Sequence, residues 1–350
     1  MKKYRIIILI IIIALSLFVC NYKKPYPLSD TEIAQSEDTA QFHFIDVGQG
    51  DCILIQNGKT NIMIDAGTYE SGSVICKYLE DLGIEYLDYF IGTHPHEDHL
   101  GGASSVLRSV DVGTVFLGGE TSTAYYFEKL VDVLIERDIE PVIPDMNCIY
   151  EIGALRLKFL SPTKDFKDTN HNSLIAMVQF KDVKAIFTGD AEAPSETNMI
   201  EEGLNLSADI LKVGHHGSRY GSTAKFLAKV KPSVSVISCG ENNSYGHPHK
   251  EALERLSAIG TTVLRTDKLG TVLLRTDGKN IYNATGEVIE KNNTDISNYN
   301  TEEVYIGNKK SKIFHISGCP NLPSEKNSVN LISRESAIDE GYKACGNCNP

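Results

Sequence analysis

Short apolar runs separated by polar turns fill most of the chain from about residue 42 onward. The runs at 42–47, 51–56 and 60–67 are rich in Ile and Phe and end in Gly or Asn, which is typical of β-strands. Further strands are expected at 88–93, 113–117, 154–160, 173–180, 184–188, 209–213, 233–238, 261–265 and 270–276. Apolar residues at helical spacing predict helices at 73–83, 100–108, 124–137, 192–202, 222–230 and 249–259. Strands with helices inserted between them predict an α+β fold, an αββα sandwich of two packed sheets with helices outside.

The first twenty residues have a different pattern. Basic residues at positions 2, 3 and 5 precede an apolar run from Ile6 to Val19, too short for the roughly 20 residues that span a bilayer comfortably. Positive charge ahead of such a run places the rest of the chain outside the cytoplasm. We therefore expect an extracytoplasmic protein, held to the membrane by residues 1–20 as an uncleaved anchor, held as a lipoprotein through Cys20, or secreted. The polar stretch 21–40 is expected to be a linker.

Composition adds a constraint on partners. The 350 residues are 41% hydrophobic and carry a formal net charge of −12. A field of that sign does not attract nucleic acid non-specifically. A bound divalent cation would reverse the sign locally, so the charge argues against a nucleic-acid substrate only weakly. The sequence carries no indication of oligomeric state.

The stretch Thr93-His-Pro-His-Glu-Asp-His-Leu-Gly-Gly is the main candidate for chemistry. His94, His96, Asp98 and His99 directly follow an expected strand. Imidazole and carboxylate groups suit zinc, manganese or iron. In a loop that turns into a helix, the first two histidines share one direction and the last two residues reach another position. One segment can therefore serve two metal ions.

More metal-binding side chains stand where other expected strands begin or end. A sandwich of sheets gathers such positions at one edge, so these residues are expected to join the same site. They are Asp65, His171, Asp190, His215, His216, His247 and His249.

Residues 41–285 resemble the metallo-β-lactamase superfamily and, within it, the ComEC/Rec2-like branch. The stretches that carry the resemblance are FIDVGQGDCILIQ, IMIDAG, GTHPHEDHLGG, HNSL, IFTGD, LKVGHHGS and YGHPHKEALERL. These stretches match the hydrolase part of ComEC and not its polytopic channel, so we expect hydrolysis and not translocation.

The resemblance implies a site for two divalent metals, zinc or manganese. It assigns His94, His96 and His171 to the first metal and Asp98, His99 and His216 to the second, with Asp190 bridging them. Asp65 is expected to orient the loop, and His215 to lie behind the ligands or contact substrate. His247 or His249 would complete the site or protonate the leaving group.

The expected reaction is hydrolysis. Water shared by two cations becomes hydroxide near neutral pH and can attack phosphorus or a carbonyl. The branch resemblance favours a phosphodiesterase or nuclease acting on DNA or a related phosphodiester. The alternatives are a lactonase or β-lactamase, since fold does not fix function, and a metal-bearing module that binds DNA or cell wall.

The end of the chain is expected to form a separate zinc module at 312–350, after a linker at 286–311. His315 and Cys319 form an H-x3-C pair, and Cys345 and Cys348 form a C-x2-C pair. This spacing predicts one structural zinc, which such a small core needs; a disulfide between the last two cysteines is the alternative. The segment resembles the Ada-like metal-binding module. His315 replaces that module's first cysteine, which argues against repair by a reactive thiol.

Overall fold

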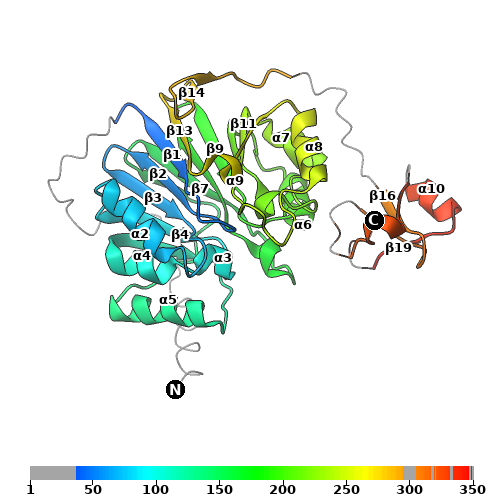
Figure 1. Ribbon diagram of the computed structural model, residues 1–350, viewed down its shortest axis with the longest axis horizontal. Helices are drawn as coiled ribbons and strands as arrows, with labels where there is room; N and C mark the ends of the chain where they lie inside the picture. Colours follow the sequence, from blue (N-terminus) through cyan, green and yellow to red (C-terminus); the bar gives the residue numbers. More distant parts are fainter. Residues whose placement is uncertain are drawn as a thin grey trace.

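Two β-sheets packed face to face, with helices on both outer sides, form the part of the chain that should carry the site (Figure 1). The computed structural model describes residues 37–294, 305–316, 319, 321–331, 334–346 and 348. The predictions for residues 1–20 and for most of 21–40 lie outside these ranges. The expected αββα sandwich is confirmed.

The first sheet has eight strands in the order β15-β14-β13-β1-β2-β3-β4-β5. Their bounds are β1 Ala40–Phe44, β2 Ile53–Asn57, β3 Thr60–Ile64, β4 Tyr86–Gly92, β5 Asp111–Leu117, β13 Val272–Thr276, β14 Ile281–Tyr282 and β15 Val288–Ile289. Side chains alternate along each strand, so Ile53 and Ile55 pack between the sheets while Leu54 packs on the outer face. The helices on that face are α2 Gly72–Asp81, α4 Ala103–Ser109 and α5 Tyr125–Glu136.

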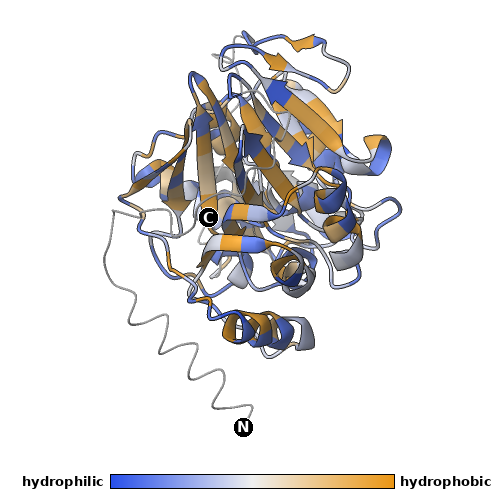
Figure 2. Ribbon diagram, turned by 90° about the vertical axis from the view of Figure 1, so that its left-hand side faces the viewer, coloured by the Kyte–Doolittle hydropathy of each residue, from blue (hydrophilic) through white to orange (hydrophobic). Residues whose placement is uncertain are grey.

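The second sheet has seven strands in the order β12-β11-β10-β9-β8-β7-β6. Their bounds are β6 Ile149–Ile152, β7 Leu155–Ser161, β8 Ile175–Phe180, β9 Val183–Phe187, β10 Ile210–Lys212, β11 Val234–Ile237 and β12 Thr262–Arg265. Its outer face is covered by α6 Ala193–Glu201, α7 Ala224–Val230 and α8 Lys250–Ala258, and α9 Thr266–Leu269 follows β12. Figure 2 shows mostly apolar residues along the strands of the two packed sheets and a mixture of apolar and polar residues along the helices.

Parallel strands in both sheets bring the candidate site residues to one edge of the sandwich. β3 and β4 run parallel in the first sheet, and β9, β10 and β11 run parallel in the second. Because the carboxyl ends of parallel strands meet at one edge, the loops after these five strands come together.

Some elements differ from the expected ones. The helix expected at 100–108 is divided into α3 Glu97–Leu100 and α4, with Gly101 and Gly102 between them. A Cβ at Gly102 would lie 2.3 Å from the Ala66 carbonyl oxygen, so the close approach of the loop after β3 requires glycine. Strand β6 was not expected. Within the range expected to be a linker, β15 pairs with β14.

The C-terminal segment has a small sheet of its own, in the order β18-β16-β17-β19. Its elements are β16 Tyr305–Asn308, β17 Ile313–Ile316, η3 Glu325–Asn327, β18 Ser328–Leu331, α10 Arg334–Asp339 and β19 Lys343–Ala344. Strand β16 begins before residue 312, where the module was expected to begin. Among the described residues, no helix has both the length and the apolar character needed to cross a membrane.

Candidate metal centre

The loop after β4 brings the His-rich motif to the edge of the sandwich. His96 is extended and directly precedes α3, so His94 and His96 lie on the loop while Asp98 and His99 lie on the helix. The loop before β2 packs against this turn, where the Asp51 amide donates to the Asp98 carbonyl oxygen at 3.0 Å. A Cβ at Gly50 would lie 2.4 Å from that oxygen, which explains the glycine in the FIDVGQGD stretch.

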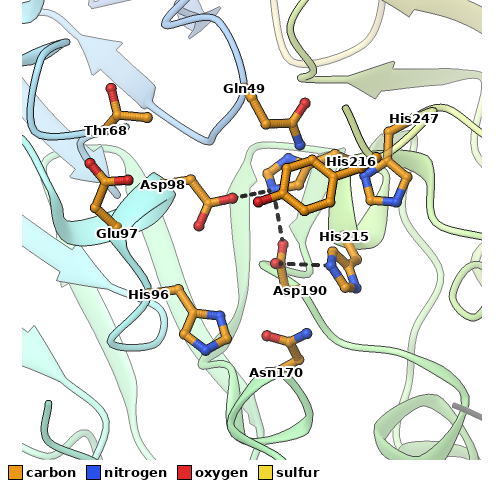
Figure 3. Close-up of a pocket in the computed structure, with 11 residues that line it drawn as sticks. Gln49, Thr68, His96, Glu97, Asp98, Asn170, Asp190, His215, His216 and His247 are labelled. Carbon is orange, nitrogen blue, oxygen red and sulfur yellow. Dashed lines mark ion pairs between the residues drawn. The ribbon is translucent and has the colours of Figure 1, made fainter. Parts of the chain in front are cut away.

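A pocket of about 440 Å³ opens above the motif (Figure 3). Carboxylate and imidazole groups dominate it. It is lined by Gln49, Thr68, His96, Glu97, Asp98, Asn170, Asp190, His215, His216, Tyr245 and His247.

Asp190 lies at the centre of the candidate ligands. Its Oδ1 lies 3.1 Å from His99 Nε2 and 3.5 Å from His216 Nε2. Its Oδ2 lies 3.7 Å from His94 Nε2 and 3.6 Å from His215 Nε2. The two oxygens of one carboxylate therefore face two separate groups of histidines, as a bridging ligand requires.

Two groups of side chains that share Asp190 are compact enough to hold a metal ion. Within each group, the ligand atoms all lie within 4.8 Å of one another. One group is His94, His96 and Asp190, and the other is Asp98, His99, Asp190 and His216.

The buried atoms of these groups fit divalent metals. His99 Nε2, His216 Nε2 and Asp190 Oδ1 are buried and have no hydrogen-bond partner among the described residues. Burying polar atoms without a partner is costly. A cation placed among them would satisfy all three.

A second row of carboxylates holds the histidines from behind. Asp65 Oδ2 lies 2.7 Å from His99 Nδ1, and Asp65 also accepts from the Thr93 amide at 2.8 Å. Glu192 Oε1 lies 2.7 Å from His215 Nδ1. Such partners fix the ring orientation and tautomer of a ligating histidine, and the role expected for Asp65 agrees with its position.

His216 Nδ1 donates to the Ser238 carbonyl oxygen at 3.0 Å, and a buried ion pair lies beside it. Asp51 Oδ1 lies 3.3 Å from His216 Nδ1, and Asp51 Oδ2 lies 2.7 Å from Lys212 Nζ. Both side chains are at most 1% exposed. Neither residue had an expected role from its sequence pattern, although a lysine inside the apolar stretch Ile210–Val213 must be paired when buried. That requirement was the available signal.

The charges of the site favour bound cations. Asp51, Asp65, Asp98, Asp190 and Glu192 surround the histidines, and Lys212 is paired with one of them. Burial opposes protonation of His216, but Asp190 and Asp51 outweigh it and raise the pKa of His216 to about 10. The pKa of His99 is also raised, by Asp190 and Asp65 against the effect of burial. Positive charge is therefore favoured where the two groups of ligands lie.

His171 is not brought to the candidate ligands, contrary to the expectation that it binds the first metal. It lies in the short 3₁₀ helix η1 Thr169–Asn172 and is buried, with its Nε2 3.4 Å from Glu192 Oε2. The preceding residue, Asn170, lines the pocket instead. In so tight a turn, adjacent side chains point in different directions, so one position decides which residue faces the site.

The two histidines after β11 have different surroundings. His247 lines the pocket, and burial together with His215 and His216 lowers the pKa of His247 to about 3. His249 is not among the lining residues, and its Nδ1 accepts from the Arg219 amide at 3.1 Å. The structure does not bring His249 to the ligands.

The C-terminal segment has its own cluster. His315, Cys319, Cys345 and Cys348 have ligand atoms within 4.8 Å of one another, as the spacing predicted. His315 Nδ1 lies 3.2 Å from Cys319 Sγ, and the three cysteines are free thiols. A hydrogen bond from Cys319 lowers the pKa of Cys348 to about 6, which favours a thiolate, the form that binds metal.

A comparison with known proteins matches the chain to one family of metal-dependent hydrolases. The family model described as the metallo-β-lactamase superfamily matches residues 45–241. ComE operon protein 3 of Bacillus subtilis is 31% identical over 247 residues, covering 65% of this chain and 32% of that protein. Recombination protein 2 of Haemophilus influenzae is 31% identical over 238 residues, covering 66% of this chain and 28% of that protein. Competence protein ComA of Neisseria gonorrhoeae is 28% identical over 240 residues, covering 68% of this chain and 32% of that protein. The chain thus matches less than a third of each relative.

Proposed function

Because this chain belongs to the metallo-β-lactamase superfamily of metal-dependent hydrolases, we propose that it is a phosphodiesterase or nuclease with two divalent metals, zinc or manganese. The observation that carries the proposal is Asp190, whose two oxygens face two groups of ligands. His94 and His96 would hold one ion, and Asp98, His99 and His216 the other. Bound metals would supply a deprotonated water and neutralise charge that develops on the substrate.

The reaction is hydrolysis of one ester bond. The oxygen of water bonds to phosphorus, the bond from phosphorus to the leaving oxygen breaks, and a proton ends on that oxygen. His215 lines the pocket and is oriented by Glu192 at 2.7 Å, so it is placed to contact a substrate oxygen. Asp65 and Asp51 hold His99 and His216 in position from behind.

DNA or a related phosphodiester is the proposed substrate class. The support is the similarity to proteins named for competence and recombination. The chain spans under a third of these relatives, so their activity as whole proteins is not carried over. The resemblance to the ComEC/Rec2-like branch is nevertheless confirmed over the hydrolase part.

A panel of substrates tests the proposed reaction. The purified full chain, loaded with zinc or with manganese, should hydrolyse bis-p-nitrophenyl phosphate and single-stranded DNA and leave nitrocefin intact. Hydrolysis of nitrocefin alone would replace the phosphodiesterase by a lactamase. Hydrolysis of none of them by fully loaded protein would favour a binding module.

We also propose that residues 21–350 lie outside the cytoplasm, supported by the basic start and the apolar run Ile6–Val19. Protease added to intact cells should then degrade the chain. Protection until the cells are lysed would contradict this. Cys20→Ser should release the protein from the membrane only if it is a lipoprotein.

A further inference from the structure

The exposed aromatic side chains of the described residues are three tyrosines, of which one lines the metal pocket and two lie close to residues that line it. Tyr69, Tyr125 and Tyr245 are 41%, 61% and 64% exposed. Single exposed apolar residues are ordinary on protein surfaces. Three that gather at and near one pocket are less ordinary, because the fold at least partly packs every other aromatic ring that the structure describes.

One ring lines the pocket, a second belongs to the neighbour in sequence of a lining residue, and the third packs against the second. Tyr245 lines it directly and stacks on His247, with ring centroids 5.7 Å apart and planes 20° apart. Tyr69 follows the lining residue Thr68, and its amide donates to Glu97 Oε1 at 2.9 Å. Tyr125 packs edge-on against Tyr69 at 5.7 Å.

The rings stand on two sides of the candidate metal ligands. Figure 3 places Thr68 and Glu97 at one side of the pocket and His247 at the other, with Asp98 and Asp190 between them. Tyr69 and Tyr125 therefore belong to the first side, and Tyr245 belongs to the second. A polymer that crosses the pocket would meet flat rings before and after the reacting group.

We propose that these tyrosines stack on unpaired bases of a single-stranded nucleic acid whose phosphodiester lies in the metal pocket. The inference rests on the proposed function. In a nucleic acid, each phosphodiester joins two nucleosides whose flat bases can stack on aromatic rings. Stacking on aromatic side chains accepts any base, since every base has a π-face. It also needs no basic surface, which suits a chain with a net charge of −12. Bases in a duplex are already stacked on one another, so a duplex cannot use these rings.

Binding without turnover tests the inference separately from the reaction. Fluorescence anisotropy would measure the affinity of the full chain in detergent for three labelled probes, with calcium in place of zinc or manganese to avoid turnover. The probes are an oligothymidine, an abasic oligomer of equal length and phosphate number, and a duplex. The oligothymidine should bind best. Tyr245→Ala, and Tyr69→Ala combined with Tyr125→Ala, should each weaken oligothymidine binding about tenfold and leave abasic binding unchanged.

Two control variants sharpen the comparison. Tyr245→Phe keeps the ring and should keep the affinity for oligothymidine. Ile149→Ala removes a side chain that is 48% exposed and outside the pocket lining, and it should leave that affinity unchanged. Equal affinity for oligothymidine and the abasic oligomer would overturn the inference. So would duplex binding as tight as single-strand binding, an equal loss for all probes in the alanine variants, or no measurable oligothymidine binding by the wild-type chain. None of these results depends on whether the bound strand is cleaved.

Discussion

Variants of the ion pair between Lys212 and Asp51 should change the free energy of unfolding and the affinity for metal in different ways. Lys212 Nζ lies 2.7 Å from Asp51 Oδ2, and both side chains are at most 1% exposed. Lys212→Met has similar length and leaves the Asp51 carboxylate buried without its cation. Breaking such a pair costs about 3–5 kcal/mol of the free energy of unfolding, because an uncompensated charge stays in the interior.

Removing both charges should reverse most of that loss. In the double variant Lys212→Met with Asp51→Asn, no unpaired charge is left, and replacing a buried ion pair as a whole is often neutral. The metal site should behave differently. His216 Nδ1 donates to the Ser238 carbonyl oxygen at 3.0 Å and lies 3.3 Å from Asp51 Oδ1, so both groups favour a proton on Nδ1 and leave Nε2 free for a metal. Losing the carboxylate should weaken metal binding by roughly tenfold, the lower end of the range for such partners, because the Ser238 carbonyl still orients the ring.

Urea denaturation and calorimetric metal titration measure the two effects on the same preparations. Lys250→Met is the control, because its partner Glu254 lies 3.1 Å away on the surface, with side chains 85% and 61% exposed. That exposed pair should contribute little. The reasoning fails if Lys212→Met is as stable as wild type, or if the double variant is as unstable as the single one. It also fails if the stable double variant binds its second metal with wild-type affinity.

Two further variants test the boundaries of the site. His171→Ala should keep the wild-type number of bound metals, whereas His94→Ala should lose one, because only His94 lies in a ligand group. Elemental analysis that shows an equal loss of metal from both variants would restore His171 as a ligand. His315→Ala should release one zinc from the C-terminal cluster and leave turnover of bis-p-nitrophenyl phosphate nearly unchanged. Loss of that turnover with the sandwich still folded would make the cluster part of the active site.

The local part of the site could be predicted because its ligands are neighbours in sequence. His94, His96, Asp98 and His99 follow a buried strand and turn into a helix, so their spacing alone indicates two directions of approach. The alternation of apolar residues likewise predicted most strands, since each of the two sheets has one face in the common core. Of His215 and His216, the structure groups His216 with Asp98, and the assignment of His216 as the metal ligand stays a prediction.

The rest depends on contacts between distant residues or on turn geometry. Asp51 and Lys212 meet only because the loop before β2 and the end of β10 reach the same edge of the sandwich. His171 and Asn170 differ by one position in a 3₁₀ turn, and pattern alone cannot decide which one faces the pocket. The linker expected at 286–311 was polar in sequence, yet β15 and β16 at its two ends pair with neighbouring strands.

Replacing Asp98 by Asn tests the two-metal hydrolase most directly. Asp98 Oδ2 lies 3.3 Å from His216 Nε2 in the second ligand group, so the variant keeps the shape and removes one charge. Glu97→Gln is the matched control, because Glu97 lines the pocket next to Asp98 and is in neither ligand group.

Elemental analysis and bis-p-nitrophenyl phosphate turnover would be measured on the same samples. The fully loaded wild-type chain and the Glu97 variant should hold three metals, two in the hydrolase and one in the C-terminal cluster. The Asp98 variant should hold two, and its turnover should fall by at least about 100-fold, in line with the several kcal/mol that a catalytic metal contributes. An Asp98 variant with all three metals and the wild-type rate would contradict the account.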